Sequence, residues 1–242
     1  MEQGIENKTK GKLHLIPTPI SEGTASNVLP ENLLKFVEEA EEFITENIKT
    51  TRRYLRSIGF KGDFDQIPYH LINKHTSENE LPGFLKGAEE GKTIALFSEA
   101  GMPCVADPGA LVVKIAHQKK IKVIPVNGPS SIMLALAASG FNGQNFAFNG
   151  YLPIQSADRT KQIKKYEARV KSENQTQIFI EAPYRNNQLL EAFIKTCEPD
   201  TLLCVASEIT AEHEFIKTLP VKAWQKEKPN LHKKNTIFLM YK

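Results

Sequence analysis

The stretch "TIALFSEAGMPCVADPGALVVKIAH", residues 93–117, carries the strongest structural signal in the chain. Its first part, 93–98, is a continuous apolar run, which is typical of a strand buried on both faces of a parallel sheet. A turn rich in glycine and proline follows at 98–109, and an apolar segment with helical spacing comes next. Ligands bind where turns leave the carboxyl ends of such strands. The stretch therefore predicts an α/β fold and makes this turn a candidate site.

Short apolar runs alternate with helix-compatible segments through the first half of the chain. The predicted strands are 12–18, 41–45, 65–71, 93–98 and 122–126. The predicted helices are 30–40, 48–59, 109–120 and 78–91, the last interrupted by Pro82. Such alternation predicts a mainly parallel sheet. We therefore expect an N-terminal α/β domain over 11–126, preceded by a polar, flexible arm at 1–10.

The pattern of predicted strands and helices changes after residue 126. The predicted strands are 145–153, 176–183, 201–209, 213–220 and 235–242, with helices at 131–140, 158–171 and 186–197. The last three strands follow one another with little helix between them, which predicts antiparallel pairing. We expect a C-terminal α/β domain with a mixed sheet over 127–242.

Composition bounds the class of protein. The 242 residues have a formal net charge of +3 and are 40% hydrophobic, which is ordinary for a globular protein with a substantial core. No apolar run is long enough to span a membrane. The three cysteines form no CxxC pair, so a disulfide framework and a zinc site are poorly supported. We expect a cytoplasmic protein with no metal and no membrane partner.

Four stiff turns lie at predicted strand ends, at 17–23, 98–103, 127–131 and 149–153. Glycine lets the backbone approach a ligand closely, and proline fixes the turn. The chain has no GxGxxG after its first strand, no phosphate loop, no HExxH and no GxSxG. Ordinary turns and a shared ligand site both remain open on the residues alone.

Charged segments raise a second pair of alternatives. In "IEAPYR" (180–185), Glu181 and Arg185 form either an ion pair that closes a turn or an acid and a guanidinium that face a ligand. The basic segments 49–56 and 159–171 are either solvated helix faces or surfaces that bind phosphates.

Taken in order, "SEAGMPCVADPG", "VIPVNGPSSIMLALAASG", "FNGYLP" and "IEAPYR" resemble the motif series of the tetrapyrrole methylase superfamily. Within it, they are most similar to the bacterial methyltransferases that modify a cytidine ribose 2′-hydroxyl in small-subunit ribosomal RNA. The resemblance implies two α/β domains, S-adenosylmethionine in the cleft between them, and a homodimer.

The same resemblance implies which residues form the site. The positions that would face the cofactor are Pro19, Glu99, Ala100, Gly101, Pro129, Ser130, Tyr151 and Leu152. A ribose hydroxyl also needs a base or an electrostatic trap for its developing charge. From their expected places at strand ends, Glu181 and Glu208 are the candidate bases, and Arg185 is the candidate clamp for a substrate phosphate.

Some motifs depart from the family pattern. "ENIK" (46–49) stands where the family has "EDTR", "SEITA" (207–211) where it has "RELTK", and Ser21-Glu22 where it has Gly-Asn. Glu99 begins the triplet that usually reads "DAG". We therefore expect methyl transfer to RNA, with two alternatives. One is a methyltransferase for a tetrapyrrole or another small molecule, and the other is a weakly catalytic cofactor-binding partner of RNA or protein.

Overall fold

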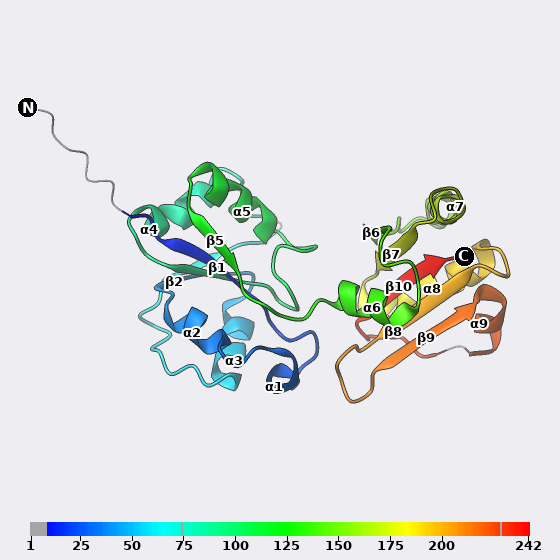
Figure 1. Cartoon of the computed structure of the whole chain (residues 1–242), viewed down its shortest axis with the longest axis horizontal. Coiled ribbons are helices and arrows are strands. Elements are labelled where there is room, and N and C mark those ends of the chain that lie inside the picture. The colour runs from blue at the N-terminus through cyan, green and yellow to red at the C-terminus, as the bar shows by residue number, and fades with distance from the viewer. Residues whose placement is uncertain (1–8, 74, 228) are drawn as a thin grey trace, which may run out of the picture. The chain divides into compact units, whose positions relative to one another are not determined.

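The computed structural model describes residues 9–73, 75–227 and 229–242. The predicted flexible arm, 1–10, lies outside the described residues except for its last two. The chain divides into two compact units, Met1–Pro129 and Ser130–Lys242, each with its own sheet and helices (Figure 1).

The described residues of the first unit form a five-stranded sheet with the strand order β3-β2-β4-β1-β5. Its strands are β1 (Lys12–Ile16), β2 (Glu42–Thr45), β3 (Tyr69–Leu71), β4 (Ile94–Phe97) and β5 (Lys122–Pro125). Every neighbouring pair is parallel, so the predicted parallel sheet is confirmed. The sheet places β4, with its buried apolar run, at the centre.

Helices cover both faces of this sheet (Figure 1). They are α1 (Ala25–Val28), α2 (Leu33–Glu38), α3 (Ile48–Ser57), the 3-10 helix η1 (Leu81–Leu85), α4 (Lys86–Glu89) and α5 (Gly109–Gln118). Side chains of a strand alternate between the two faces. In β4, Ile94 and Leu96 pack toward η1, α4 and α5, whereas Ala95 and Phe97 pack toward α2 and α3.

The segment 78–91, predicted as a helix interrupted by Pro82, forms two short helical pieces. A 3-10 helix occupies its middle, with Pro82 in the first turn, and only four residues of α-helix follow. Proline has no backbone N–H and fixes its own φ, so it suits the start of a helical segment and not its interior. The segment still buries Leu81 and Leu85 against the sheet.

The described residues of the second unit form a mixed five-stranded sheet with the order β6-β7-β10-β8-β9. The strands are β6 (Phe146–Tyr151), β7 (Thr176–Ile180), β8 (Leu202–Ser207), β9 (Phe215–Pro220) and β10 (Thr236–Tyr241). β6 and β7 are parallel, and every other pair is antiparallel. The mixed sheet and the antiparallel pairing of the last strands are therefore confirmed.

The helices of this unit are α6 (Ser131–Ser139), α7 (Ser156–Glu173), the 3-10 helix η2 (Pro183–Arg185), α8 (Asn186–Thr196) and α9 (Val221–Glu227). The sequence did not predict α9, which stands between β9 and β10. Its Trp224 is fully buried and donates a hydrogen bond from Nε1 to the Leu203 carbonyl at 3.0 Å. This short helix forms because two apolar residues, Val221 and Trp224, share the face that meets the core.

None of the helices in the described part of the chain is both long enough and apolar enough to cross a bilayer.

Candidate functional site

The carboxyl ends of the parallel strands place several predicted turns at one edge of the first unit's sheet. The turn after β1 and the turn after β4 are joined there by a two-way backbone pairing. Thr18 N donates to Gly101 O at 3.0 Å, and Gly101 N donates to Thr18 O at 3.1 Å. The Ser98 hydroxyl also donates to Gly101 O at 2.8 Å. The chain next to Pro19 and the triplet Glu99-Ala100-Gly101 are therefore held together.

The segment after β5 reaches the same place. Gly101 has a φ of +75°, and a Cβ on it would lie 3.2 Å from the carbonyl oxygen of Pro129. Likewise, a Cβ on Gly128 would lie 2.2 Å from the Cβ of Pro17. These close approaches require glycine at both positions. Five of the residues that the resemblance singles out, Pro19, Glu99, Ala100, Gly101 and Pro129, therefore belong to one edge.

Glu99 is exposed at this edge and is held by helix α3. Its Oε1 accepts a hydrogen bond from the Thr50 hydroxyl at 2.7 Å. Thr50 lies in the first turn of α3, which the Asn47 side chain caps by accepting from the backbone N–H of Lys49 at 2.9 Å. The departure "ENIK" thus supplies a helix cap, since asparagine is a preferred residue there. Sequence analysis missed Thr50, whose role depends on a contact across 49 residues.

Two further carboxyl groups, Glu46 and Asp107, have raised pKa values. Burial and the charges of Asp107 and Glu99 raise the pKa of Glu46, which follows β2. Burial also raises the pKa of Asp107, although its oxygens accept from Cys104 N and Gly109 N, both at 2.8 Å. Mutual repulsion and burial both disfavour the ionised forms. A cation placed beside these groups would offset that cost.

The segment between Pro103 and Asp107 is strained. Cys104 and Ala106 have positive φ values of 68° and 63°, a region that residues with a side chain rarely adopt. Asp107 stabilises this shape through its bonds to Cys104 N and Gly109 N. Burial and the nearby charge of Asp107 raise the pKa of the Cys104 thiol to about 12. Cys104 is therefore a protonated packing residue and not a nucleophile at neutral pH.

The remaining predicted site residues lie in the second unit. There the carboxyl ends of β6, β7 and β8 lie at the same edge of the sheet as the start of β10. Tyr151, the last residue of β6, is in register with Ile180, the last residue of β7. Ile180 in turn pairs with Ile237, next to the start of β10. Tyr151 is 63% exposed at this edge, and the adjacent Leu152 is buried. Ser130 begins the unit and caps α6 by accepting from Met133 N at 3.4 Å.

Glu181 and Arg185 form the ion pair that the sequence offered as one alternative. The carboxylate, 1% exposed, accepts from Arg185 Nη2 at 2.5 Å and from Ala182 N at 2.7 Å. These bonds close the turn from β7 into η2. Arg185 Nε is buried and has no hydrogen-bond partner in the part of the chain that is described.

Glu208 follows β8 in a strained turn. Its φ is +52°, and Thr210, a β-branched residue, has a φ of +73°. Glu208 Oε1 accepts from Asn235 N at 2.6 Å, and Glu208 N donates to Asn235 O at 2.8 Å. Strained turns that their surroundings hold in place gather at functional sites. Within the described residues, Oε2 of Glu208 has no hydrogen-bond partner, so that oxygen is open to a hydrogen-bond donor.

The described residues contain no group of three or more histidine, cysteine, aspartate or glutamate side chains that could hold a metal ion.

The sequence pattern of the family described as Tetrapyrrole (Corrin/Porphyrin) Methylases matches residues 29–224, well over half of the chain. The chain belongs to the tetrapyrrole methylases. It is accordingly a methyltransferase, and its two sheets show the fold of this family.

Two relatives of this methylase carry the name Ribosomal RNA small subunit methyltransferase I. The protein from Buchnera aphidicola subsp. Schizaphis graminum is 31% identical over 97% of this chain and 79% of the relative. The protein from Escherichia coli O157:H7 is 28% identical over 98% of this chain and 80% of the relative. These alignments extend through both units.

The crystal structure of the methyltransferase CobJ is similar to this methylase with a TM-score of 0.62 and 16% identity. The match covers 96% of this chain and 94% of CobJ. At so low an identity the likeness shows the fold alone.

Proposed function

We propose that this methylase transfers a methyl group from S-adenosylmethionine to RNA, with a ribose 2′-hydroxyl as the acceptor. The paired turn of Thr18 and Gly101, with the Glu99 carboxylate beside it, is the observation that supports the methyl donor. The names of the two relatives support RNA as the acceptor. The proposal also includes a cytoplasmic location and a homodimer, the latter to be checked by light scattering of the purified protein.

The residues at the first unit's edge fit S-adenosylmethionine by their chemistry. The cofactor has a positive sulfonium, a positive α-ammonium group, and ribose hydroxyls that donate hydrogen bonds. The exposed Glu99 carboxylate accepts such bonds, and Glu46 and Asp107 add negative charge. Gly101 has no side chain, so its backbone is open to close approach.

The proposed cofactor-binding residues come from both units. They are Pro19, Glu99, Ala100, Gly101, Pro129, Ser130, Tyr151 and Leu152. When bound, the cofactor supplies an electrophilic methyl group on sulfur. The protein must then orient the acceptor hydroxyl in line with that methyl group, because positioning accounts for much of such catalysis.

The second unit's edge supplies the groups for the acceptor. Glu208 is the first candidate base, because its Oε2 is without a partner among the described residues while Oε1 is anchored to Asn235 N. Glu181 is the second candidate, and its bond to Arg185 makes it equally suited to fixing that guanidinium. Arg185 is the candidate clamp for a substrate phosphate, because a guanidinium binds phosphates well and part of this side chain, 15%, is exposed.

The test combines a binding and a transfer measurement. Calorimetry with S-adenosylmethionine should show binding, and a labelled methyl group should enter RNA from ribosomal small subunits that lack this modification. Label that enters a small-molecule extract and not RNA would support the tetrapyrrole alternative. Cofactor binding with no labelled acceptor would support the weakly catalytic alternative.

Variants then separate the roles of the two acids. Glu208→Gln should lower kcat by about 100-fold or more with little change in cofactor affinity, because removing a general base typically costs 10²–10⁴-fold. The matched control is Glu191→Gln, which removes an exposed carboxylate on α8. Full turnover by both Glu208→Gln and Glu181→Gln would show that neither acid is the base.

A further inference from the structure

Outside the two edges, the first unit has an open hollow of about 500 Å³. It is lined by Arg52 and Arg56 of α3 and by residues 60–65 of the loop that follows. Every lining residue belongs to the first unit, so the hollow is complete within it. Neither the proposed cofactor site nor the proposed acceptor site uses these residues.

Two cations of the hollow have no acidic partner. Arg52 Nη2 is 3.1 Å from Asp65 Oδ1 and donates to the Phe64 carbonyl at 3.0 Å. In contrast, Arg56 and Lys61 form no ion pair with any residue that the structure describes. The other acid of the hollow, Asp63, accepts a hydrogen bond from Asp65 N at 3.0 Å. The lining thus has three cations against two acids, a net positive charge to which Arg56 and Lys61 contribute without an ion pair.

Aromatic rings fix the position of one of these cations. The guanidinium carbon of Arg56 is 5.1 Å from the centre of the Phe64 ring, within range of a cation–π interaction. Phe64 is itself packed against Phe60, with ring centres 5.6 Å apart, and both rings are buried. A guanidinium held over a ring keeps its N–H groups available at its rim. Such a pre-ordered arginine suits a phosphate well.

Helix α3 connects the hollow to the edge that carries Glu99. Thr50 in its first turn bonds to Glu99, and Arg56 lies six residues further along. At 1.5 Å per residue, that separation is roughly 9 Å along the helix axis. The helix also contains Lys49, Arg52 and Arg53 and has no aspartate or glutamate. A polyanion bound at the hollow could follow this positive helix toward the methyl donor.

We propose that this hollow, with Arg56 and Lys61 as its unpaired cations, binds backbone phosphates of the RNA substrate. The inference rests on the proposed function, because it assigns a place to the RNA of that reaction. The contacts are to phosphates, so they position the strand without reading its bases.

The salt dependence of RNA binding gives the test. Affinity for a labelled single-stranded RNA would be measured by fluorescence anisotropy from 50 to 300 mM salt. Each phosphate contact contributes about 0.7 to the slope of log affinity against log salt for a single strand. We expect Arg56→Gln/Lys61→Gln to lower the magnitude of the slope by about 1.4 and to weaken binding at least tenfold at low salt. Its affinity for S-adenosylmethionine should be unchanged by calorimetry.

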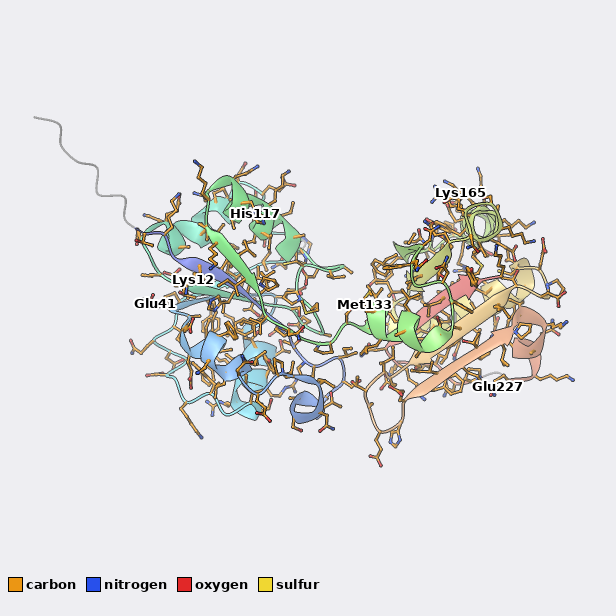
Figure 2. All side chains as sticks on the ribbon, viewed as in Figure 1. Lys12, Glu41, His117, Met133, Lys165 and Glu227 are labelled. Carbon is orange, nitrogen blue, oxygen red and sulfur yellow. The ribbon has the colours of Figure 1, made fainter. Side chains whose placement is uncertain are left out.

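The matched control removes the same charge elsewhere. Lys12→Gln/Lys114→Gln alters one exposed lysine on β1, which Figure 2 labels, and one on α5, both outside the basic segments 49–56 and 159–171. Its slope should match the unmodified protein. An equal loss of slope in the control would mean that net charge alone governs binding, and this would overturn the proposal. Should the double variant unfold more easily, Lys61→Gln alone carries the test with an expected loss of about 0.7.

The outcomes separate this inference from the proposed function. In one outcome, the unmodified protein binds and methylates RNA while Arg56→Gln/Lys61→Gln keeps the same salt slope. That result would overturn the phosphate site in the hollow and leave the proposed function intact. Cofactor binding with neither RNA binding nor RNA methylation by the unmodified protein would overturn both.

Discussion

Thr18 and Gly101 pair through two backbone hydrogen bonds, although 83 residues separate them in the chain. The pairing joins the turns that follow β1 and β4, two neighbouring strands of the parallel sheet. It also sets the position of Glu99, two residues before Gly101. The proposed methyl-donor edge is thus held by main-chain atoms, and changes at Gly101 should act on it directly.

Gly101→Ala should weaken S-adenosylmethionine binding by at least tenfold. The residue has a φ of +75°, and its new Cβ would lie 3.2 Å from Pro129 O, so the turn must shift. The positive φ also costs about 1–2 kcal/mol of stability for a residue with a side chain. Calorimetry would measure the affinity, and urea unfolding would measure the free energy of unfolding.

Gly140→Ala is the matched control for this change. Gly140 has a similar φ, +79°, at the end of α6, but no atom lies within 4 Å of its added Cβ. Gly140→Ala should therefore lower the free energy of unfolding through its positive φ and leave the affinity for S-adenosylmethionine unchanged. Equal affinities for the two variants would contradict the role given to Gly101.

Glu99→Gln should reduce the affinity for S-adenosylmethionine by about 10–100-fold, because hydrogen bonds to charged groups contribute about 1.5–3 kcal/mol. Thr50→Val removes the hydroxyl that holds Glu99 Oε1 and should reduce affinity less, by about threefold to tenfold. Calorimetry would compare both variants with Glu191→Gln, an exposed acid on α8. An unaltered affinity in Glu99→Gln would remove this carboxylate from the proposed site.

Cofactor binding should release protons at mildly acidic pH. The pKa of Glu46 is raised above its ordinary value by burial and by Asp107 and Glu99, so part of it is protonated just above pH 4.5. A bound cation favours the ionised form and lowers that pKa, so protons leave as the cofactor binds. Affinity should rise with pH through the raised pKa of Glu46 and level off above it.

Calorimetry at a series of pH values from 4.5 upward, in buffers with different ionisation enthalpies, measures this release. The released fraction should fall in Glu46→Gln, which cannot ionise at that position. A release that is the same in the variant and the unmodified protein would assign the protons to another group.

The sequence predicted both sheets because their strands have distinct patterns. The run 93–98 has four consecutive apolar residues, 94–97, which became the central β4, whereas the last strands, close together in the chain, became antiparallel. Local signals were weaker for α9, a short helix whose existence depends on burying Trp224. At 78–91 the interruption of the helix at Pro82 was predicted, whereas the 3-10 form of Leu81–Leu85 was not.

The candidate site was predictable only in part. Turn residues such as Gly101 stand out in the sequence, because glycine allows backbone conformations that other residues avoid and proline fixes its own φ. The partners of Glu99 and Glu46 do not stand out, because Thr50 and Asp107 reach them from other elements through tertiary contacts. From the sequence, Glu181 and Arg185 allowed two interpretations, an ion pair or two groups that face a ligand. The ion pair became evident only in the folded structure.

The last prediction concerns stability at the opposite end of β2, where Glu42 is buried. Its Oε1 accepts from Lys92 Nζ at 2.8 Å, and its Oε2 is 3.0 Å from His70 Nε2. A Cβ added to Gly87 would lie 2.4 Å from Oε1 of Glu42, so the Glu42 carboxylate packs directly against this glycine. Burial alone raises the pKa of Glu42, but the hydrogen bonds and charges of Lys92 and His70 outweigh burial and lower it.

A lowered pKa means that the ionised Glu42 stabilises the fold above pH 4.5, and that this contribution disappears as the pH falls through the lowered value. Glu42→Gln should therefore reduce the free energy of unfolding by about 1–3 kcal/mol at pH 7, with a smaller difference near pH 3. Urea unfolding at both pH values would measure it. Glu89→Gln, which breaks the more exposed Lys119–Glu89 pair, should cost no more than about 1 kcal/mol. A loss in Glu42→Gln that is as large at pH 3 as at pH 7 would show that shape, and not charge, accounts for the effect.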